Sequence, residues 1–137
     1  MITSFLTIEQ KEKLFEFINF CKKQGFKVSG REEEGFISDM TFHGMQVVRF
    51  YIGYLKVQTK MEKSSYANRI ELTYKLADVV SFNMNDLMME KEMKHLQNII
   101  LDLVEQYKVL KNSIKLKEIE KDFKDDLWWF WKVDGRI

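Results

Sequence analysis

The chain has 137 residues, of which 45% are apolar and 31% are charged, a composition typical of one globular domain rather than of a disordered segment. Its 22 basic and 21 acidic residues leave a formal net charge of +1, which does not indicate a strongly basic nucleic-acid-binding protein. The single cysteine excludes an intrachain disulfide and a zinc site built from several cysteines.

An amphipathic helix is predicted over residues 7–24. Thr7 and Gln10 have the spacing of a capping box, and Gly25 follows two lysines at the expected end of the helix. Between these signals, apolar residues recur at the helical period. They are Leu14, Phe17, Ile18 and Cys21. We expect this stripe to be buried, with Cys21 as a structural thiol rather than a reactive one.

The pattern then changes to a two-residue period with single glycines between apolar runs, which predicts antiparallel strands. Strands are expected at 26–29, 36–42, 45–60, 69–76 and 78–82. In the longest of them, a bulge at Gly53 would keep Ile52 and Leu55 on the same buried face. Residues 61–67 are interpreted as a polar connection. The region is therefore predicted to form an antiparallel meander of four to five strands.

A long helix is predicted to begin near Asn85–Asp86, where a cap and an acidic first turn coincide. Apolar residues then follow a heptad pattern as far as Ile114. The register breaks near Asn112–Ser113, so we expect a kink or a second helix there. The stripe is broad, which favours packing on the chain's own sheet, and a homodimer is the alternative. Residues of that dimer seam would be Met93, Leu96, Ile100, Leu103, Tyr107 and Leu110.

Four consecutive aromatic residues lie close to the C-terminal end of the chain. They are Trp128, Trp129, Phe130 and Trp131. We expect a short aromatic strand or tail here, which either completes the core or offers a face to another protein. Tryptophan is a favoured anchor in protein interfaces, so these four residues are the predicted partner-binding site. Neighbouring aspartates disfavour insertion into an anionic membrane surface.

Residues that commonly carry catalysis or bind metals are few. The two histidines, His43 and His95, have no second ligand at a known metal-site spacing, and the six glycines form no phosphate-binding loop. We therefore expect no catalytic residues, no metal and no cofactor, and a protein that is not an enzyme.

A basic, tyrosine-bearing sheet face is the alternative site. Its residues alternate with the apolar ones along the predicted strands, so they share the outward face. They are Arg49, Tyr51, Tyr54, Lys56, Lys60 and Arg69. Basic groups can contact phosphates and tyrosines can stack on bases, which favours nucleic-acid or nucleotide binding. An ordinary solvated sheet face has the same composition.

Taken together, these patterns predict an α+β fold in one domain over residues 1–137. Its parts are an N-terminal helix, the meander, a long C-terminal helix on the sheet, and the aromatic terminus. Residues 116–137 are a semi-independent appendage in the alternative interpretation. The expected function is a small cytoplasmic protein-binding module. Lysine far outnumbers arginine, a bias common in phages and mobile elements, so a regulator or inhibitor of a host protein is the expected role.

Overall fold

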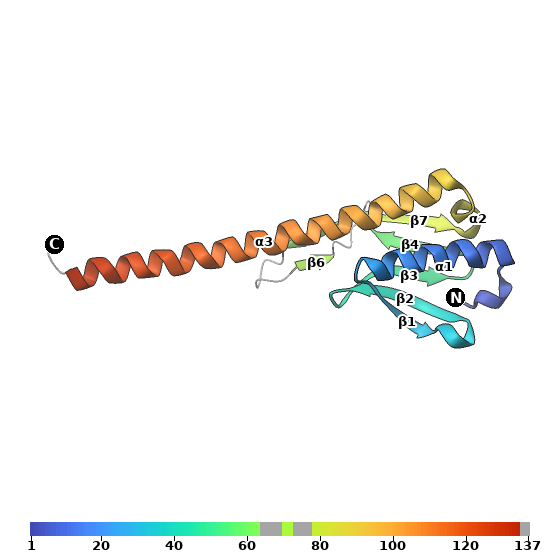
Figure 1. The fold of residues 1–137 in the computed structure, drawn as a ribbon, viewed down its shortest axis with the longest axis horizontal. Coiled ribbons are helices and arrows are strands. Elements are labelled where there is room, and N and C mark those ends of the chain that lie inside the picture. Colours follow the sequence, from blue (N-terminus) through green and yellow to red (C-terminus); the bar gives the residue numbers. More distant parts are fainter. Residues whose placement is uncertain (64–69, 73–77, 135–137) are drawn as a thin grey trace.

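The computed structural model describes residues 1–63, 70–72 and 78–134, and for residues 71, 72 and 117–134 it describes the backbone alone. It confirms the predicted α+β fold (Figure 1). An N-terminal helix and a long C-terminal helix pack on a five-stranded antiparallel sheet, and the far half of the long helix extends beyond the sheet (Figure 1).

The N-terminal helix, α1 (Ile8–Lys23), follows a 3₁₀ turn, η1 (Thr3–Phe5), and begins as predicted. The Thr7 hydroxyl accepts a hydrogen bond from Gln10 N (3.1 Å), and Gln10 Oε1 accepts one from Thr7 N (3.0 Å). Gly25 ends the helix with φ = 97°, a conformation that glycine adopts without steric cost.

The main sheet has the strand order β1-β2-β3-β4-β7. Its strands are β1 (Lys27–Arg31), β2 (Phe36–Phe42), β3 (Met45–Tyr51), β4 (Tyr54–Gln58) and β7 (Val79–Asn83). A 3₁₀ turn, η2 (Glu32–Glu34), joins β1 to β2. The N-terminal residues also run beside β2, because Ile2 pairs with Phe36 in an antiparallel bridge and Ile37 N donates to Met1 O (2.9 Å).

The prediction of one strand over residues 45–60 is wrong. The chain turns at Ile52 and Gly53, so that Tyr51 pairs with Tyr54 and Phe50 pairs with Leu55. Gly53 has φ = 78°, which a tight turn requires at this position. Ile52 is at the turn and 85% exposed, not on the buried face. Along most of β3 and in β4, buried apolar residues alternate with more exposed ones, and each strand begins this alternation anew. The positions of the apolar residues therefore shift at the turn between the two strands.

The connection predicted at 61–67 contains a strand. β5 (Met61–Lys63) pairs with β6 (Ile70–Leu72) in a separate two-stranded sheet. Met61 is buried, and its backbone N donates to Gln106 Oε1 (3.0 Å) on the long helix, which attaches this sheet to that helix. The strand predicted at 69–76 is therefore confirmed only at 70–72, since residues 64–69 and 73–77 lie outside the described residues.

The C-terminal helical region has two parts, α2 (Met84–Leu87) and α3 (Glu90–Asp134). Asn83 caps α2, two residues before the predicted start. α3 continues through Asn112–Ser113 to Asp134, so the expected kink and the expected aromatic strand or tail are both wrong. The change of apolar face near residue 112 thus occurs within one helix.

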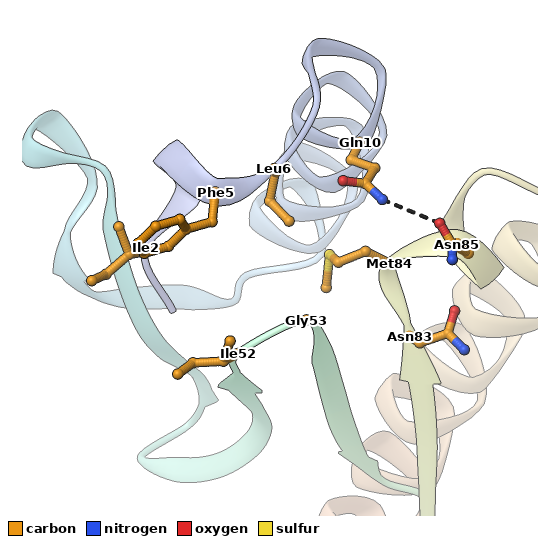
Figure 2. A pocket seen from close by; sticks show the side chains of 9 residues that line it. All are labelled: Ile2, Phe5, Leu6, Gln10, Ile52, Gly53, Asn83, Met84 and Asn85. Carbon is orange, nitrogen blue, oxygen red and sulfur yellow. Dashed lines mark hydrogen bonds between the residues drawn. The ribbon is translucent and has the colours of Figure 1, made fainter.

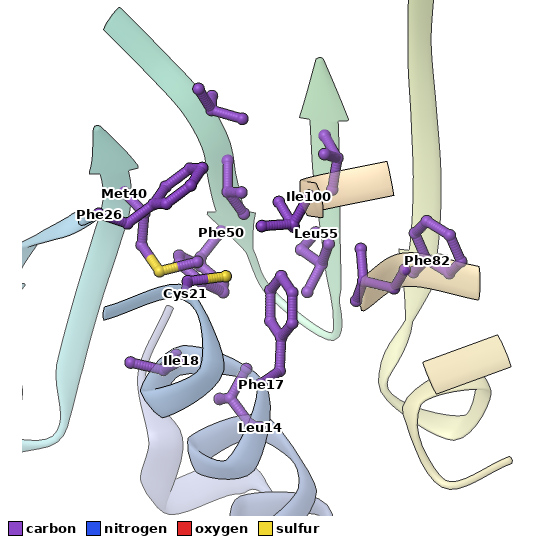
Figure 3. Close-up of a cluster of buried hydrophobic side chains, with 14 of the residues drawn as sticks. Leu14, Phe17, Ile18, Cys21, Phe26, Met40, Phe50, Leu55, Phe82 and Ile100 are labelled. Atoms are coloured by element: carbon purple, nitrogen blue, oxygen red, sulfur yellow. The ribbon is translucent and has the colours of Figure 1, made fainter. Parts of the chain in front are cut away.

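One hydrophobic core lies between the sheet and the two long helices (Figure 3). Phe17 from α1, Leu55 from β4 and Ile100 from α3 are all fully buried in it. The packing of α3 on the sheet confirms the favoured interpretation of its apolar stripe. The opposite face of the sheet remains exposed at Arg49 and Lys56.

Candidate functional site

The histidines and the cysteine lie apart in different environments. His43 stacks on Tyr107 with ring centroids 4.1 Å apart, and His95 lies beside Phe82. Cys21 is fully buried in the core, as predicted. Among the side chains that the structure describes, no group of three His, Cys, Asp or Glu residues is placed to hold a metal ion.

The exposed face of the sheet brings together four of the six residues predicted for nucleic-acid binding. Arg49 lies opposite Lys56 across β3 and β4, and Tyr51 lies opposite Tyr54. The tyrosine rings are stacked, with centroids 4.9 Å apart and an interplanar angle of 8°. Lys56 Nζ lies 5.6 Å from the centroid of the Tyr51 ring, within range of a cation–π contact. Lys60 lies beyond the end of β4, and Arg69 is outside the described residues.

Two neighbours favour the charged form of Arg49. A hydrogen bond with the Tyr51 hydroxyl raises the pKa of the Arg49 guanidinium, and the Asp39 carboxylate adds to the effect. Asp39 also accepts a hydrogen bond from Gln46 Nε2 (2.7 Å). Arg49, Tyr51 and Lys56 line a shallow pocket of about 260 Å³ on this face. The arrangement places two exposed cations beside a pair of stacked tyrosine rings.

A second surface lies at the end of the sheet where the chain begins, and we call it the end patch. Its members are four large apolar residues from three separate segments, all exposed to solvent. They are Ile2 (48% exposed), Phe5 (80%), Phe36 (42%) and Ile52 (85%). Ile2, Phe5 and Ile52 surround a pocket of about 340 Å³, and Figure 2 shows their side chains around it.

Hydrogen bonds between three elements hold this pocket in shape. Gln10 Nε2 on α1 donates to Asn85 Oδ1 on α2 (3.2 Å), and Met84 N donates to Gly53 O in the β3–β4 turn (3.0 Å). Gln10 also belongs to the capping box of α1, so its position is fixed from two sides. None of the lining residues is charged, which gives an apolar hollow with neutral amides at its rim.

Sequence reasoning missed the end patch. Its residues come from three segments, which are brought together by the pairing of Ile2 with Phe36 and by the hairpin turn at Ile52. One signal was present, because Ile2 and Phe5 are apolar residues outside the helical stripe. That signal does not say which distant residues lie beside them.

The residues predicted for dimerisation lie at the junction of α3 and the sheet. Met93, Leu96, Ile100 and Leu103 are buried in the core, and Tyr107 and Leu110 pack partly buried against it. This stripe therefore serves the core of one chain, and dimerisation through it stays a prediction.

The aromatic cluster, residues 128–131, lies on the helical backbone of α3, and its side chains are outside the described part. Successive positions of an α-helix are about 100° apart, so these four residues do not divide between two faces as they would in a strand. Their role in partner binding stays a prediction.

Three comparisons with known proteins found no matching family model, no matching curated protein and no matching solved structure. Among the described residues, no helix combines the length and the apolar character needed to cross a bilayer.

Proposed function

We propose that the chain is a protein-binding module and that the end patch is its contact surface. The observation that supports this proposal is the exposure of four large apolar side chains at one end of the molecule. Single exposed apolar residues are common on protein surfaces, whereas a contiguous apolar patch around a pocket is typical of an interaction site. Phe5 and Ile52 are the most exposed members of the patch, at 80% and 85%.

The chemistry of the pocket indicates the kind of partner. An uncharged lining gives no compensation for burying a charged side chain, so the anchor is an aromatic or aliphatic side chain of another protein. The amides of Gln10, Asn83 and Asn85 at the rim can hydrogen-bond to the partner's backbone or to an indole N–H. Aromatic anchors of this kind commonly supply much of the binding energy of an interface.

N-acetyl-tryptophanamide, a neutral aromatic probe, tests the proposal by NMR titration of the full chain. We expect saturable shifts of the backbone amides of Gly53, Met84 and Asn85, which line the pocket. Shifts that do not saturate, or that spread evenly over the surface, would contradict the proposal.

The paired variant Phe5→Ser/Ile52→Gln should lower the affinity for the probe at least tenfold. Its far-UV circular dichroism spectrum should stay unchanged, because both side chains are exposed. Val109→Gln is the matched control, since Val109 is 58% exposed on α3 and does not line the pocket. Equal affinities for the wild type and the paired variant would overturn the assignment.

The sequence also supports finer proposals about the partner. The aromatic cluster at 128–131 would be a second contact, and the lysine-rich composition favours a phage or mobile-element product that regulates or inhibits a host protein in the cytoplasm. Alanine at Trp128 and Trp131 should reduce binding to such a partner by at least tenfold in a chain that stays folded. An unchanged affinity would remove the cluster from the proposal.

Nucleic-acid or nucleotide binding on the exposed sheet face is the second candidate. The observation that favours it is the alignment of Arg49 with Lys56 beside the stacked pair Tyr51 and Tyr54. If the face makes two phosphate contacts, the logarithm of the association constant for a labelled single-stranded oligonucleotide should fall with the logarithm of the salt concentration, with a slope of about −1.4. Arg49→Gln should flatten the slope by about 0.7, and binding that ignores salt would exclude this function.

A further inference from the structure

A groove lies between α3 and the turn that joins β2 to β3, at the opposite end of β3 from the end patch. It consists of two open hollows of about 540 and 560 Å³, within the size range of sites for small ligands. The hollows form one surface, which we call the lysine groove, because they share four lining residues. These are His43, Tyr107, Lys111 and Lys115. Lys108 also lines the groove, and among the described residues no aspartate or glutamate does.

The lysines of the groove form a positively charged stripe on α3. Lys108, Lys111 and Lys115 are three and four residues apart, so they are neighbours on one face of the helix. All three are exposed, and none of the ion pairs between described side chains includes one of them. Like charges at this spacing destabilise a helix, and a bound anion would offset their repulsion. The stripe therefore favours an anionic ligand.

The positive charges are confined to a short length of the helix. With a rise of 1.5 Å per residue, the stretch from Lys108 to Lys115 spans about 10 Å along the axis of α3. Proteins that bind single-stranded nucleic acid usually follow its backbone with an extended basic groove over several nucleotides. Three ammonium groups within two turns of helix instead suit a compact ligand with adjacent negative charges, such as a polyphosphate chain.

A pair of aromatic rings lies beside these lysines. The rings of His43 and Tyr107 are stacked, with centroids 4.1 Å apart and an interplanar angle of 10°. Phe42 contacts the edge of this pair, because its centroid lies 4.5 Å from that of His43 and 5.2 Å from that of Tyr107. On the outer face of His43, Phe42 would lie much farther from Tyr107 than from His43. The outer face of the exposed His43 ring is therefore free of Phe42 and accessible to another planar ring.

The backbone at His43 does not itself require an imidazole ring. Phe42 pairs with Met45, so His43 and Gly44 form a two-residue hairpin turn with φ = 49° and 79°. Asparagine and glycine are the usual residues in a turn that has two positive φ angles. The histidine instead supplies a ring that stacks on Tyr107, at the point where the turn meets the lysine groove.

We propose that the lysine groove binds a nucleoside polyphosphate, with its phosphates on the three lysines and its base on the outer face of His43. Ammonium groups bind phosphate as point charges, and bases stack on histidine and tyrosine rings. An acidic peptide would pair with the lysines but leave the His43 face uncovered. The groove shares no residue with the end patch or the exposed sheet face, so it is a third surface of the chain.

NMR titration of the full chain with ATP, in buffer without divalent cations, tests the class of ligand. We expect saturable shifts of the backbone amides of His43, Gly44 and Lys111. Methyl triphosphate, which has the phosphates but no base, should bind at least about fivefold more weakly, because stacking is lost. A tetraglutamate peptide should also bind more weakly than ATP. No saturable shift with ATP, or equal affinities for ATP and either comparison probe, would overturn the proposal. Tighter binding of a single-stranded oligonucleotide at the same amides would overturn the assignment to a free nucleotide.

Two paired variants of α3 separate the groove from the overall charge of the chain. Lys111→Gln/Lys115→Gln should lower the affinity for ATP at least about tenfold, because two charge-assisted contacts are lost. Lys91→Gln/Lys94→Gln is the matched control, since it removes two exposed lysines of the same helix that do not line the groove. Circular dichroism should show both variants folded. Equal losses of affinity in the two variants would contradict a defined site.

His43→Asn tests the stacking of the base. Asparagine adopts the left-handed conformation readily, so the turn should keep its shape. We expect the affinity for ATP to fall to that of methyl triphosphate, whose own affinity should not change. An equal loss for both probes, or no loss, would show that His43 only holds the turn against α3 and would overturn the proposal. Phe5→Ser/Ile52→Gln and Arg49→Gln should leave ATP binding unchanged, so failure of this site and failure of either proposed function are separate results.

Discussion

Cys21 shows how burial determines the chemistry of a single residue. Its side chain has no exposed surface, and desolvation raises the pKa of the thiol above its usual range. The folded state therefore favours the neutral thiol, a stabilising contribution that is complete below the ordinary thiol pKa and declines as pH rises above it. We expect no reaction of the native chain with a thiol reagent at pH 8 and one equivalent after unfolding. Rapid labelling of the native chain would show that the core opens at α1.

Gly30 and Gly44 make a matched pair at the residue scale, because both have positive φ. A Cβ at Gly30 would lie 2.7 Å from the Phe36 carbonyl oxygen, whereas one at Gly44 would meet no atom within 4 Å. Gly44→Ala should cost about 1 kcal/mol of unfolding free energy, and Gly30→Ala at least about 2 kcal/mol more, since backbone must move. Urea denaturation measures both. Equal losses of unfolding free energy would mean that the backbone of β1 can move away from β2 without destabilising the chain.

At the scale of elements, two leucines of α3 distinguish its faces. Leu103 is fully buried against the sheet, and Leu101 is 43% exposed. Leu103→Ala should destabilise the chain by about 2–5 kcal/mol, because it leaves a cavity in the core. Leu101→Ala should cost less than about 1 kcal/mol. Denaturant midpoints at a fixed low concentration compare the two, and similar losses would contradict the packing of α3 described above.

The elements also differ in how far local sequence specifies them. α1 was predictable to within a residue at each end, because the Thr7–Gln10 capping box and the Gly25 stop are local interactions. The β3–β4 hairpin was not, since an apolar phase shift at Gly53 fits either a bulge or a turn. The pairing of Phe50 with Leu55 decides between them, and it is a contact between two strands.

At the scale of the whole molecule, the three tryptophans report on the far end of α3. Trp128, Trp129 and Trp131 all lie in the helical segment that extends beyond the sheet (Figure 1). We expect red-shifted emission that iodide quenches freely in the dilute monomer, and a blue shift when a partner covers them. Blue-shifted, protected emission from a monomer would place the cluster in contact with the domain and remove it as a binding site.

The two candidate surfaces were predictable to different extents. Residues of the exposed sheet face follow from strand alternation, so Arg49, Tyr51, Tyr54 and Lys56 could be grouped before the structure was known. The end patch joins Ile2, Phe5, Phe36 and Ile52, which no periodicity connects. Surfaces within one element or one strand pair are encoded by spacing, whereas surfaces at the meeting of several segments are not.

The sequence alone determined the α+β class, the N-terminal helix with its buried stripe, the two-residue period of the sheet and the apolar face of α3 that packs on it. Each of these depends on interactions over a few residues or on a regular period. Only the tertiary structure decided the turn at Ile52–Gly53, the unbroken course of α3 past Asn112 and the formation of the end patch. These depend on which segments meet, and segments far apart in the chain meet through burial and strand pairing that local patterns do not specify.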